Sequence, residues 1–273
     1  MKKVALITGA SSGIGMETAK LLVSKGYTVY GAARRVDKMQ ELERSGVHIL
    51  KMDVTDEASM VDGVNKILAT ENQIDVLVNN AGYGSYGSLE EVPLSEARYQ
   101  FEVNIFGLAR LTQLVLPTMR KQHSGRIINI SSIGGKIGEP HGTWYHATKL
   151  AVEGLSDSLR MELLEFGIDV VVIQPGAIVT EWAGIARDKM RRVSGNGPYK
   201  ELTEKHIKFF EQADKNGAKP IVVAKTIVDA ILAAKPKTRY ATGGSAKMIL
   251  FMRRILSDRG FDKLLLGMMK KAS

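Results

Sequence analysis

The chain has 273 residues, which is near the upper end for one α/β domain and short for two. Its hydrophobic content of 44% and charged content of 25% are those of an ordinary folded protein and exclude wholesale disorder. It has no cysteine, which excludes disulfides, thiolate metal sites and cysteine nucleophiles. The net charge is +9, and +5 of it falls in residues 245–273, so the rest of the chain is not unusually basic.

The N-terminal segment does not have the pattern of an export signal. Its apolar run, Val4–Ile7, stops at Thr8, which is too short for the hydrophobic part of a signal peptide. No apolar run elsewhere approaches the roughly 20 residues that a membrane-spanning helix needs. We therefore expect a cytoplasmic protein.

Short apolar runs alternate with amphipathic stretches through the first two thirds of the chain. The runs expected to form strands are Val4–Ile7, Thr28–Ala33, Val47–Met52, Val76–Val78, Ile127–Ile130 and Asp169–Ile173. Most of them do not alternate in polarity, which is typical of strands covered on both faces. Between them, apolar residues recur at helical spacing, as at Met16, Ala19 and Leu22. This order predicts a single-domain α/β fold of the Rossmann type, with a doubly wound parallel sheet.

Three parts are expected within this domain of residues 1–273. Residues 1–180 would form the cofactor-binding and catalytic core, and residues 181–219 a helical substrate lid. Residues 245–273 would form a basic C-terminal helical extension, rich in methionine and leucine. We favour the extension as a cap over the substrate cleft or a subunit contact, with peripheral contact to an anionic membrane as the alternative.

A glycine-rich segment, Thr8–Gly15, follows the first expected strand and opens the first expected helix. Glycines at 9, 13 and 15 would let the backbone turn tightly and let a pyrophosphate approach closely. The helix N-terminus would then face the phosphates with its N–H groups and positive dipole. The spacing differs from the G-x-G-x-x-G dinucleotide pattern, and a turn without a ligand is the alternative.

The end of the second expected strand favours NADP(H) over NAD(H). An acidic residue at this place would bind the ribose hydroxyls of NAD, whereas an arginine accommodates the 2′-phosphate of NADP. Here Arg34 and Arg35 follow the strand, and no acidic residue occurs before Asp37. Two guanidinium groups can bind a phosphate through paired hydrogen bonds. The alternative is that both arginines are simply solvated.

Tyr145 and Lys149 begin a later expected helix, and their i, i+4 spacing places a phenol and an ammonium on one face. A nearby cation lowers the pKa of a tyrosine, which would let the phenol act as a general acid or base. Such a pair is a weak signal alone. Ser132, which lies 13 residues earlier, follows the fifth expected strand, where doubly wound sheets place their active sites. Its hydroxyl could bind a substrate oxygen.

Together these motifs make the chain resemble the short-chain dehydrogenase/reductases, in particular the branch of 17β-hydroxysteroid and retinol dehydrogenases. The matching motifs are Thr8–Gly15, Asp53 within Met52–Val54, Asn79–Gly82, Val103–Gly107, Ser132, Tyr145 with Lys149, and Pro175–Thr180. They cover most of the chain up to about residue 180. The resemblance implies hydride transfer between a nicotinamide and a carbonyl or alcohol carbon, and a homodimer or homotetramer.

The resemblance also implies a role for each matching residue. Tyr145 would be the general acid/base, Lys149 would lower its pKa and bind the nicotinamide ribose, and Ser132 would orient the carbonyl. Asn104 would help hold a water that relays protons to Lys149. The expected cofactor-binding residues are Gly9, Ser11, Ser12, Gly13, Ile14, Gly15, Arg34, Arg35, Asp53, Val54, Asn80, Ala81, Gly82, Tyr145, Lys149, Pro175, Gly176, Ile178 and Thr180.

Aromatic residues in the expected cleft favour a bulky apolar substrate. The candidates for its lining are Tyr83, Tyr86, Trp144, Trp182, Phe209 and Phe210. The five histidines show no metal-ligand pattern, and we expect no metal. A catalytically silent, dinucleotide-binding redox sensor is the main alternative, and the presence of Tyr145 and Lys149 argues against it. A nucleic-acid-binding role for the basic tail lacks a recognition motif.

Overall fold

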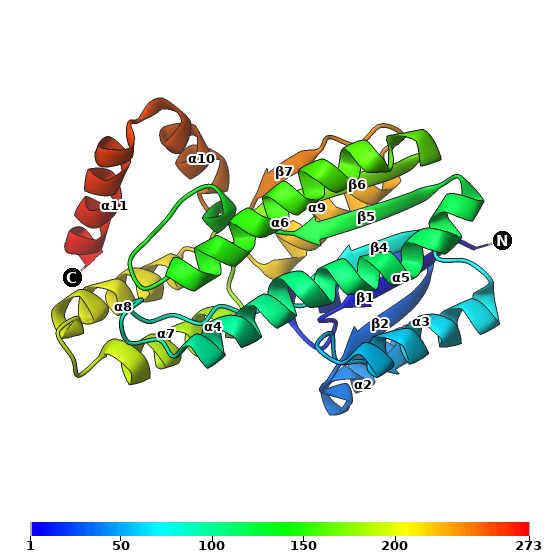
Figure 1. Cartoon of the computed structure of the whole chain (residues 1–273), viewed down its shortest axis with the longest axis horizontal. Helices are drawn as coiled ribbons and strands as arrows, with labels where there is room; N and C mark the ends of the chain where they lie inside the picture. The colour runs from blue at the N-terminus through cyan, green and yellow to red at the C-terminus, as the bar shows by residue number, and fades with distance from the viewer. Residues whose placement is uncertain (1, 273) are drawn as a thin grey trace.

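The centre of the molecule is a parallel sheet of seven strands. The computed structural model describes residues 2–272, and there the strands follow the order β3-β2-β1-β4-β5-β6-β7 (Figure 1). The strands are β1 (Val4–Thr8), β2 (Thr28–Ala33), β3 (His48–Lys51), β4 (Val76–Asn79), β5 (Gly125–Ile130), β6 (Ile168–Pro175) and β7 (Arg239–Thr242). The order reverses between β1 and β4, and ligands of such sheets bind outside the carboxyl ends at this point. The doubly wound parallel sheet predicted from the sequence is confirmed.

Helices cover both faces of the sheet. Ala5 and Ile7 of β1 point to the face covered by α1, α2 and α9, whereas Val4 and Leu6 point to the face covered by α3, α5 and α6. In Figure 1, α5 and α6 lie in front of the sheet. The helices of this double layer are α1 (Gly13–Ser24), α2 (Gln40–Arg44), α3 (Glu57–Glu71), α4 (Leu94–Phe101), α5 (Gly107–Gln122), α6 (Thr143–Glu162) and α9 (Pro220–Leu232). Burial on two faces explains why the strand sequences are continuously apolar.

The seventh strand, β7, was not expected from the sequence. It pairs only with β6 at the edge of the sheet, and three of its four residues are only partly buried, so it shows no apolar run. It is tied to α6 by Arg239, whose Nε donates to Glu153 Oε2 at 2.8 Å and whose Nη2 donates to Asp157 Oδ2 at 2.6 Å. Because polar contacts hold β7 in place, its sequence lacks the apolar run from which a strand would be predicted.

Four helices lie outside the double layer. They are α7 (Glu181–Ser194), α8 (Lys200–Lys215), α10 (Ala246–Ile255) and α11 (Asp258–Ala272). Helix α11 packs against α8, and buried Phe261, Leu265 and Met269 recur on one of its faces. Figure 1 shows α10 and α11 together at one end of the molecule. Among residues 2–272, no helix has both the length and the apolar character needed to cross a membrane.

Candidate active site

The fold gathers the predicted site residues at the carboxyl edge of the sheet. The segments that follow or end the strands there are Gly9–Gly15 after β1, Arg34 and Arg35 after β2, Asp53 and Val54 after β3, Asn80–Gly82 after β4, Ser132 after β5, and Pro175–Thr180 at the end of β6. Tyr145 and Lys149 occupy the first turns of α6. Parallel strands bring their carboxyl ends together, so residues far apart in sequence meet at one edge.

Backbone conformation and close packing require glycine in the glycine-rich turn. Gly9 has a positive φ of 65°, and a Cβ added to Gly15 would lie 2.5 Å from the Gly9 carbonyl oxygen. Asn80 Nδ2 donates to the carbonyl oxygens of Thr8 and Gly9, at 2.9 and 3.2 Å, and holds the turn in place. Ser12, the N-cap of α1, makes no side-chain capping bond. The helix N-terminus thus has the features of a pyrophosphate site.

Arg35 is the arginine that lies beside this turn. Its Nη2 is 3.4 Å from Ser11 Oγ and 3.2 Å from Glu181 Oε2 at the start of α7. Lys38 Nζ donates to the other oxygen of Glu181 at 3.2 Å. Hydrogen bonds from Lys38 and Arg35 lower the pKa of Glu181, so its carboxylate is ionised. Two cations and one competing carboxylate therefore meet where a 2′-phosphate is expected.

Arg34 points to a different partner. Its Nη1 donates to the Tyr99 hydroxyl at 2.9 Å and lies 3.9 Å from Asp53 Oδ2. The sequence did not indicate Lys38 or Glu181. Glu181 is 146 residues from Arg35 along the chain, and only the position of α7 brings the two together.

Ser132, Tyr145 and Lys149 form the centre of the site. The Ser132 hydroxyl hydrogen-bonds the Tyr145 phenol and also accepts a bond from the Gly134 N–H at 3.0 Å. Lys149 Nζ donates to the Ile130 carbonyl oxygen at 2.9 Å and lies 5.9 Å from the centre of the Tyr145 ring. The three side chains lie close together, and the roles that the family resemblance implies for them stay predictions.

The pKa of Tyr145 differs from our expectation. Burial raises it well above the usual value of a tyrosine, Ser132 lowers it by hydrogen bonding, and the nearby charge of Glu139 raises it further. Burial also lowers the pKa of Lys149 to about 8. The expected lowering of the tyrosine pKa by Lys149 is not found, because removal of water from the phenol is the largest influence on its pKa and raises it. The phenol is therefore a protonated donor at neutral pH.

Asn104 lies in a π-helical turn, Glu102–Phe106, between α4 and α5. Its Oδ1 accepts from the Tyr83 N–H at 3.1 Å, and its Nδ2 donates to Thr148 Oγ1 at 3.0 Å. A Cβ on Gly82 would lie 3.1 Å from Asn104 Oδ1 and 3.7 Å from Lys149 Nζ. The amide and the ammonium therefore border the same small space, as a shared water would require.

Other residues expected to bind the cofactor lie beside the glycine-rich turn and at the end of β6. The Thr180 hydroxyl caps α7 by accepting from the Trp182 N–H at 3.3 Å, and a Cβ on Gly13 would meet the Thr180 methyl group at 3.3 Å. The start of α7 thus lies directly over the glycine-rich turn. A Cβ on Gly176 would lie 2.1 Å from the Gly244 carbonyl oxygen, so this position also requires glycine.

Aromatic side chains cover Tyr145. The ring of Trp182 lies 5.1 Å from that of Tyr145, and the ring of Tyr86 lies 5.6 Å from it. Phe210 of α8 packs edge-on against Tyr86 at 5.2 Å. Together with Ile207, Ala186 and Met190, these residues form an apolar cluster between α7, α8 and the active site, which we call the lid cluster.

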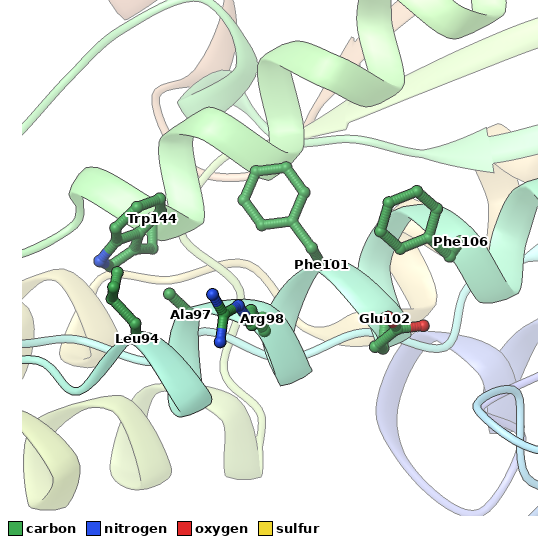
Figure 2. A pocket seen from close by; sticks show the side chains of 7 residues that line it. All are labelled: Leu94, Ala97, Arg98, Phe101, Glu102, Phe106 and Trp144. Atoms are coloured by element: carbon green, nitrogen blue, oxygen red, sulfur yellow. The ribbon is translucent and has the colours of Figure 1, made fainter.

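Trp144 does not belong to the lid cluster, and its expected place in the cleft is wrong. It lines a separate groove with Leu94, Phe101 and Phe106 of the α4–α5 segment, as Figure 2 shows. Its ring lies 6.3 Å from that of Phe101. One position before Tyr145 on a helix, a side chain points about 100° away from it, so the two aromatic residues serve different surfaces.

Beside the lid cluster lies a buried polar group that the sequence did not indicate. The Tyr86 hydroxyl donates to Glu139 at 2.8 Å, and Glu139 faces the Nε2 atoms of His146 and His206 at 3.6 and 3.8 Å. Burial would raise the pKa of Glu139, but the two nearby histidines hold it far below its usual value. His141 lies 3.2 Å from His206, 65 residues away in sequence. Within residues 2–272, no group of three such side chains is placed to bind a metal ion.

The chain is similar in sequence and structure to known oxidoreductases. A family model described as short chain dehydrogenase matches residues 3–191. The chain is 37% identical to a 3-ketodihydrosphingosine reductase of Bacteroides thetaiotaomicron, over 88% of both chains. It is 34% identical to an NADPH-dependent 3-dehydrocapnine reductase of Ornithobacterium rhinotracheale, over 98% of both. A crystal structure of a short-chain dehydrogenase from Streptomyces avermitilis has a TM-score of 0.80 and 34% identity, covering 92% of this chain and 91% of that one.

Proposed function

Because this chain belongs to the short-chain dehydrogenase/reductase family, and is thus an NAD(P)-dependent oxidoreductase, we propose that it uses NADPH to reduce the carbonyl group of a bulky apolar substrate. The observation that carries this proposal is the buried, protonated phenol of Tyr145, hydrogen-bonded to Ser132 and 5.9 Å from the Lys149 ammonium. A protonated phenol is suited to give a proton to a carbonyl oxygen, which is the direction of reduction.

Arg35, Lys38 and the glycine-rich turn support NADP(H) as the cofactor. The start of α1 supports a pyrophosphate site, because Ser12, its N-cap, makes no side-chain capping bond to the first N–H groups of the helix. Arg35 and Lys38 would hold the 2′-phosphate beside Ser11, in place of the Glu181 carboxylate. NADPH bound here would supply the hydride for the carbonyl carbon.

The protein's own groups would then provide orientation and the proton. The Ser132 hydroxyl would bind the carbonyl oxygen, and Tyr145 would donate its proton to that oxygen as negative charge develops. The Lys149 ammonium would stabilise the resulting phenolate, and a water between Asn104 and Lys149 would return a proton. The product is the alcohol.

The substrate would lie against the lid cluster, with α7 and α8 acting as the lid. Tyr86, Trp182 and Phe210 offer apolar and aromatic surface next to Tyr145. Two relatives are named as reductases of 3-ketodihydrosphingosine and 3-dehydrocapnine, which favours a ketone of a lipid-like molecule and the reductive direction. A cytoplasmic location stays a prediction of the sequence.

Tyr145→Phe tests the proposed role. We expect the turnover of ketone substrates, followed by NADPH absorbance, to fall by on the order of a thousandfold or more, because the proton donor is lost. NADPH binding, measured by fluorescence titration, should change little. The silent-sensor alternative predicts instead that the wild type turns over no ketone, aldehyde or alcohol in a broad screen. Turnover retained in Tyr145→Phe would overturn the assignment of the donor.

The groove of Leu94, Phe101, Phe106 and Trp144 supports a homo-oligomer. Phe106 and Leu94 are exposed in the single chain, and large apolar side chains grouped around a groove are typical of a subunit contact. We therefore place a dimer interface on the surface formed by α4, the π-helical turn and the start of α6.

A further inference from the structure

Helix α10 carries a row of uncovered apolar side chains. Across the described residues of α10, only Ala246 at its first position is buried. Met248, Phe251 and Ile255 are 57%, 60% and 57% exposed. Their spacing of three and four residues places them within about 60° of each other around the helix. We call these three side chains the α10 ridge.

Basic side chains border the α10 ridge. Lys247 and Arg254 are exposed and lie seven residues apart, so they share one flank of the ridge. On another side of the helix, Arg253 is engaged with its own chain, because it pairs with Asp258 at 2.6 Å and its guanidinium lies over Phe261 at 5.7 Å. The whole segment 245–273 holds seven lysines and arginines against two aspartates. The ridge therefore lies in a region of positive charge.

The two helices of the C-terminal extension differ in what covers them. Helix α11 buries its own apolar face against α8, as a cap would. Helix α10 contacts β7 and α11, yet the side chains of the α10 ridge stay exposed. Packing against α8 thus accounts for the apolar face of α11, whereas no such packing covers the exposed side of α10.

A second copy of the chain is a poor occupant of this surface. A twofold contact would set the α10 ridge against itself and bring Lys247 and Arg254 of both copies to the same contact. Like charges placed together across an interface oppose association. Anionic lipid headgroups complement the same cations, and the acyl region below them accepts large apolar side chains.

We propose that α10 is a membrane-docking helix that lies on an anionic bilayer surface, with Met248, Phe251 and Ile255 inserted among the lipids and Lys247 and Arg254 at the headgroups. The helix lies parallel to the bilayer surface. Because α11 packs against α8, docking places the lid helix α8 close to the membrane. The proposal is independent of the reaction, since it concerns only surface side chains of α10.

Vesicle flotation of the full-length protein tests this proposal. The wild type should float with vesicles of phosphatidylcholine mixed with phosphatidylglycerol and stay in solution with phosphatidylcholine alone. The double variant Phe251→Ser with Ile255→Ser, and the double variant Lys247→Glu with Arg254→Glu, should each lower the partition coefficient by on the order of tenfold or more. Wild type that stays in solution with both vesicles, or floats equally with both, overturns the proposal.

Matched variants elsewhere control for surface hydrophobicity and charge. Met161 and Leu164 are exposed near the end of α6, and Lys225 is exposed on α9. Met161→Ser with Leu164→Ser, and Lys225→Glu, should float like the wild type. Equal loss in these controls would contradict a site on α10. If Phe251→Ser with Ile255→Ser changes the oligomeric state in sedimentation while flotation is unchanged, α10 is a subunit contact and the proposal is wrong.

A single tryptophan replacement gives a second readout that does not depend on loss of binding. In Phe251→Trp, the emission should shift to shorter wavelength when vesicles containing phosphatidylglycerol are added, because the new ring enters an apolar region. Leu164→Trp, which is also at an exposed site, should show no shift. Equal behaviour of the two variants would contradict insertion of the α10 ridge.

Discussion

At the scale of single residues, the burial of Lys149 couples catalysis to stability. Its ammonium is nearly covered, and burial lowers its pKa to about 8 while the charge of Glu153 opposes the shift. In the unfolded chain the pKa of this lysine lies near 10.5, the usual value for a lysine. Burying the protonated lysine at this site therefore destabilises the folded protein. The same burial places a cation beside Tyr145.

The pH dependence of unfolding should reveal this destabilisation. Below pH 8, Lys149 is protonated in both the folded and the unfolded protein, so the folded protein is destabilised by the full free energy of burying the charged lysine. Between pH 8 and 10.5 the unfolded chain binds a proton that the folded protein lacks, so the free energy of unfolding attributable to Lys149 rises with pH, by up to about 3 kcal/mol. The free energy of unfolding, measured with urea, should be compared between the wild type and Lys149→Met at each pH. The difference between the two proteins should rise over this pH range. A difference that does not change with pH would contradict this prediction.

Arg35 carries the cofactor prediction at this scale. Arg35→Ala should weaken NADPH binding by roughly tenfold to a hundredfold and leave NADH nearly unchanged, because only NADPH brings a 2′-phosphate to this guanidinium. Isothermal titration with both cofactors measures it. Arg44→Ala, an exposed arginine at the end of α2, serves as the control and should affect neither. An equal loss for both cofactors in Arg35→Ala would refute the preference for NADP(H).

At the scale of elements, close backbone contacts position the π-helical turn that holds Asn104. Gly107 begins α5, and a Cβ there would lie 2.3 Å from the Val54 carbonyl oxygen. The loop after β3, which is expected to border the adenine, thus packs directly on this helix. Because backbone atoms cannot move aside as a side chain can, the position tolerates only glycine.

A pair of glycine variants tests this contact. Gly107→Ala should lower the free energy of unfolding by roughly 2–3 kcal/mol, since two backbone segments must separate. Gly154→Ala in the middle of α6 meets nothing within 4 Å and should raise it by about 0.5–1 kcal/mol through helix propensity. Denaturant unfolding measures both. Equal stability of the two variants would show that the contact is not rigid.

At the scale of the whole molecule, three surfaces have different proposed functions. The carboxyl edge of the sheet holds the proposed chemistry under the lid cluster, the groove beside Trp144 is the proposed subunit contact, and the α10 ridge is the proposed membrane contact. The first two surfaces share α6 and the π-helical turn, whereas the α10 ridge lies on a separate helix. Changes to the α10 ridge should therefore leave the other two surfaces largely intact.

The subunit contact leads to a whole-molecule prediction. Phe106→Glu places a carboxylate in the groove of Leu94, Phe101 and Trp144, where association would bury it without a partner. Analytical ultracentrifugation should therefore find a smaller assembly than for the wild type. Leu164→Glu, at a more exposed apolar site, should keep the wild-type assembly. An unchanged mass for Phe106→Glu would exclude this surface as the interface.

The sequence alone determined the sheet and the outline of the site, because these depend on local patterns. Continuous apolar runs mark strands buried on two faces, glycines mark the turn that approaches a phosphate, and the i, i+4 pair of Tyr145 and Lys149 is set by helix geometry. Edge strand β7 escaped prediction, since its attachment through Arg239 is polar and non-local.

The tertiary structure alone decided the electrostatics and the surfaces. Whether Lys149 lowers the pKa of Tyr145 depends on how much water the lid cluster removes, and that cluster joins segments distant in sequence. The pairing of Glu181 with Arg35 and the meeting of His141 with His206 are likewise contacts over long sequence separations. Likewise, the amphipathic pattern of the C-terminal extension is the same whether its apolar face is covered or bare. Only packing distinguishes covered α11 from the uncovered α10 ridge, because burial is a property of neighbours and not of the pattern itself.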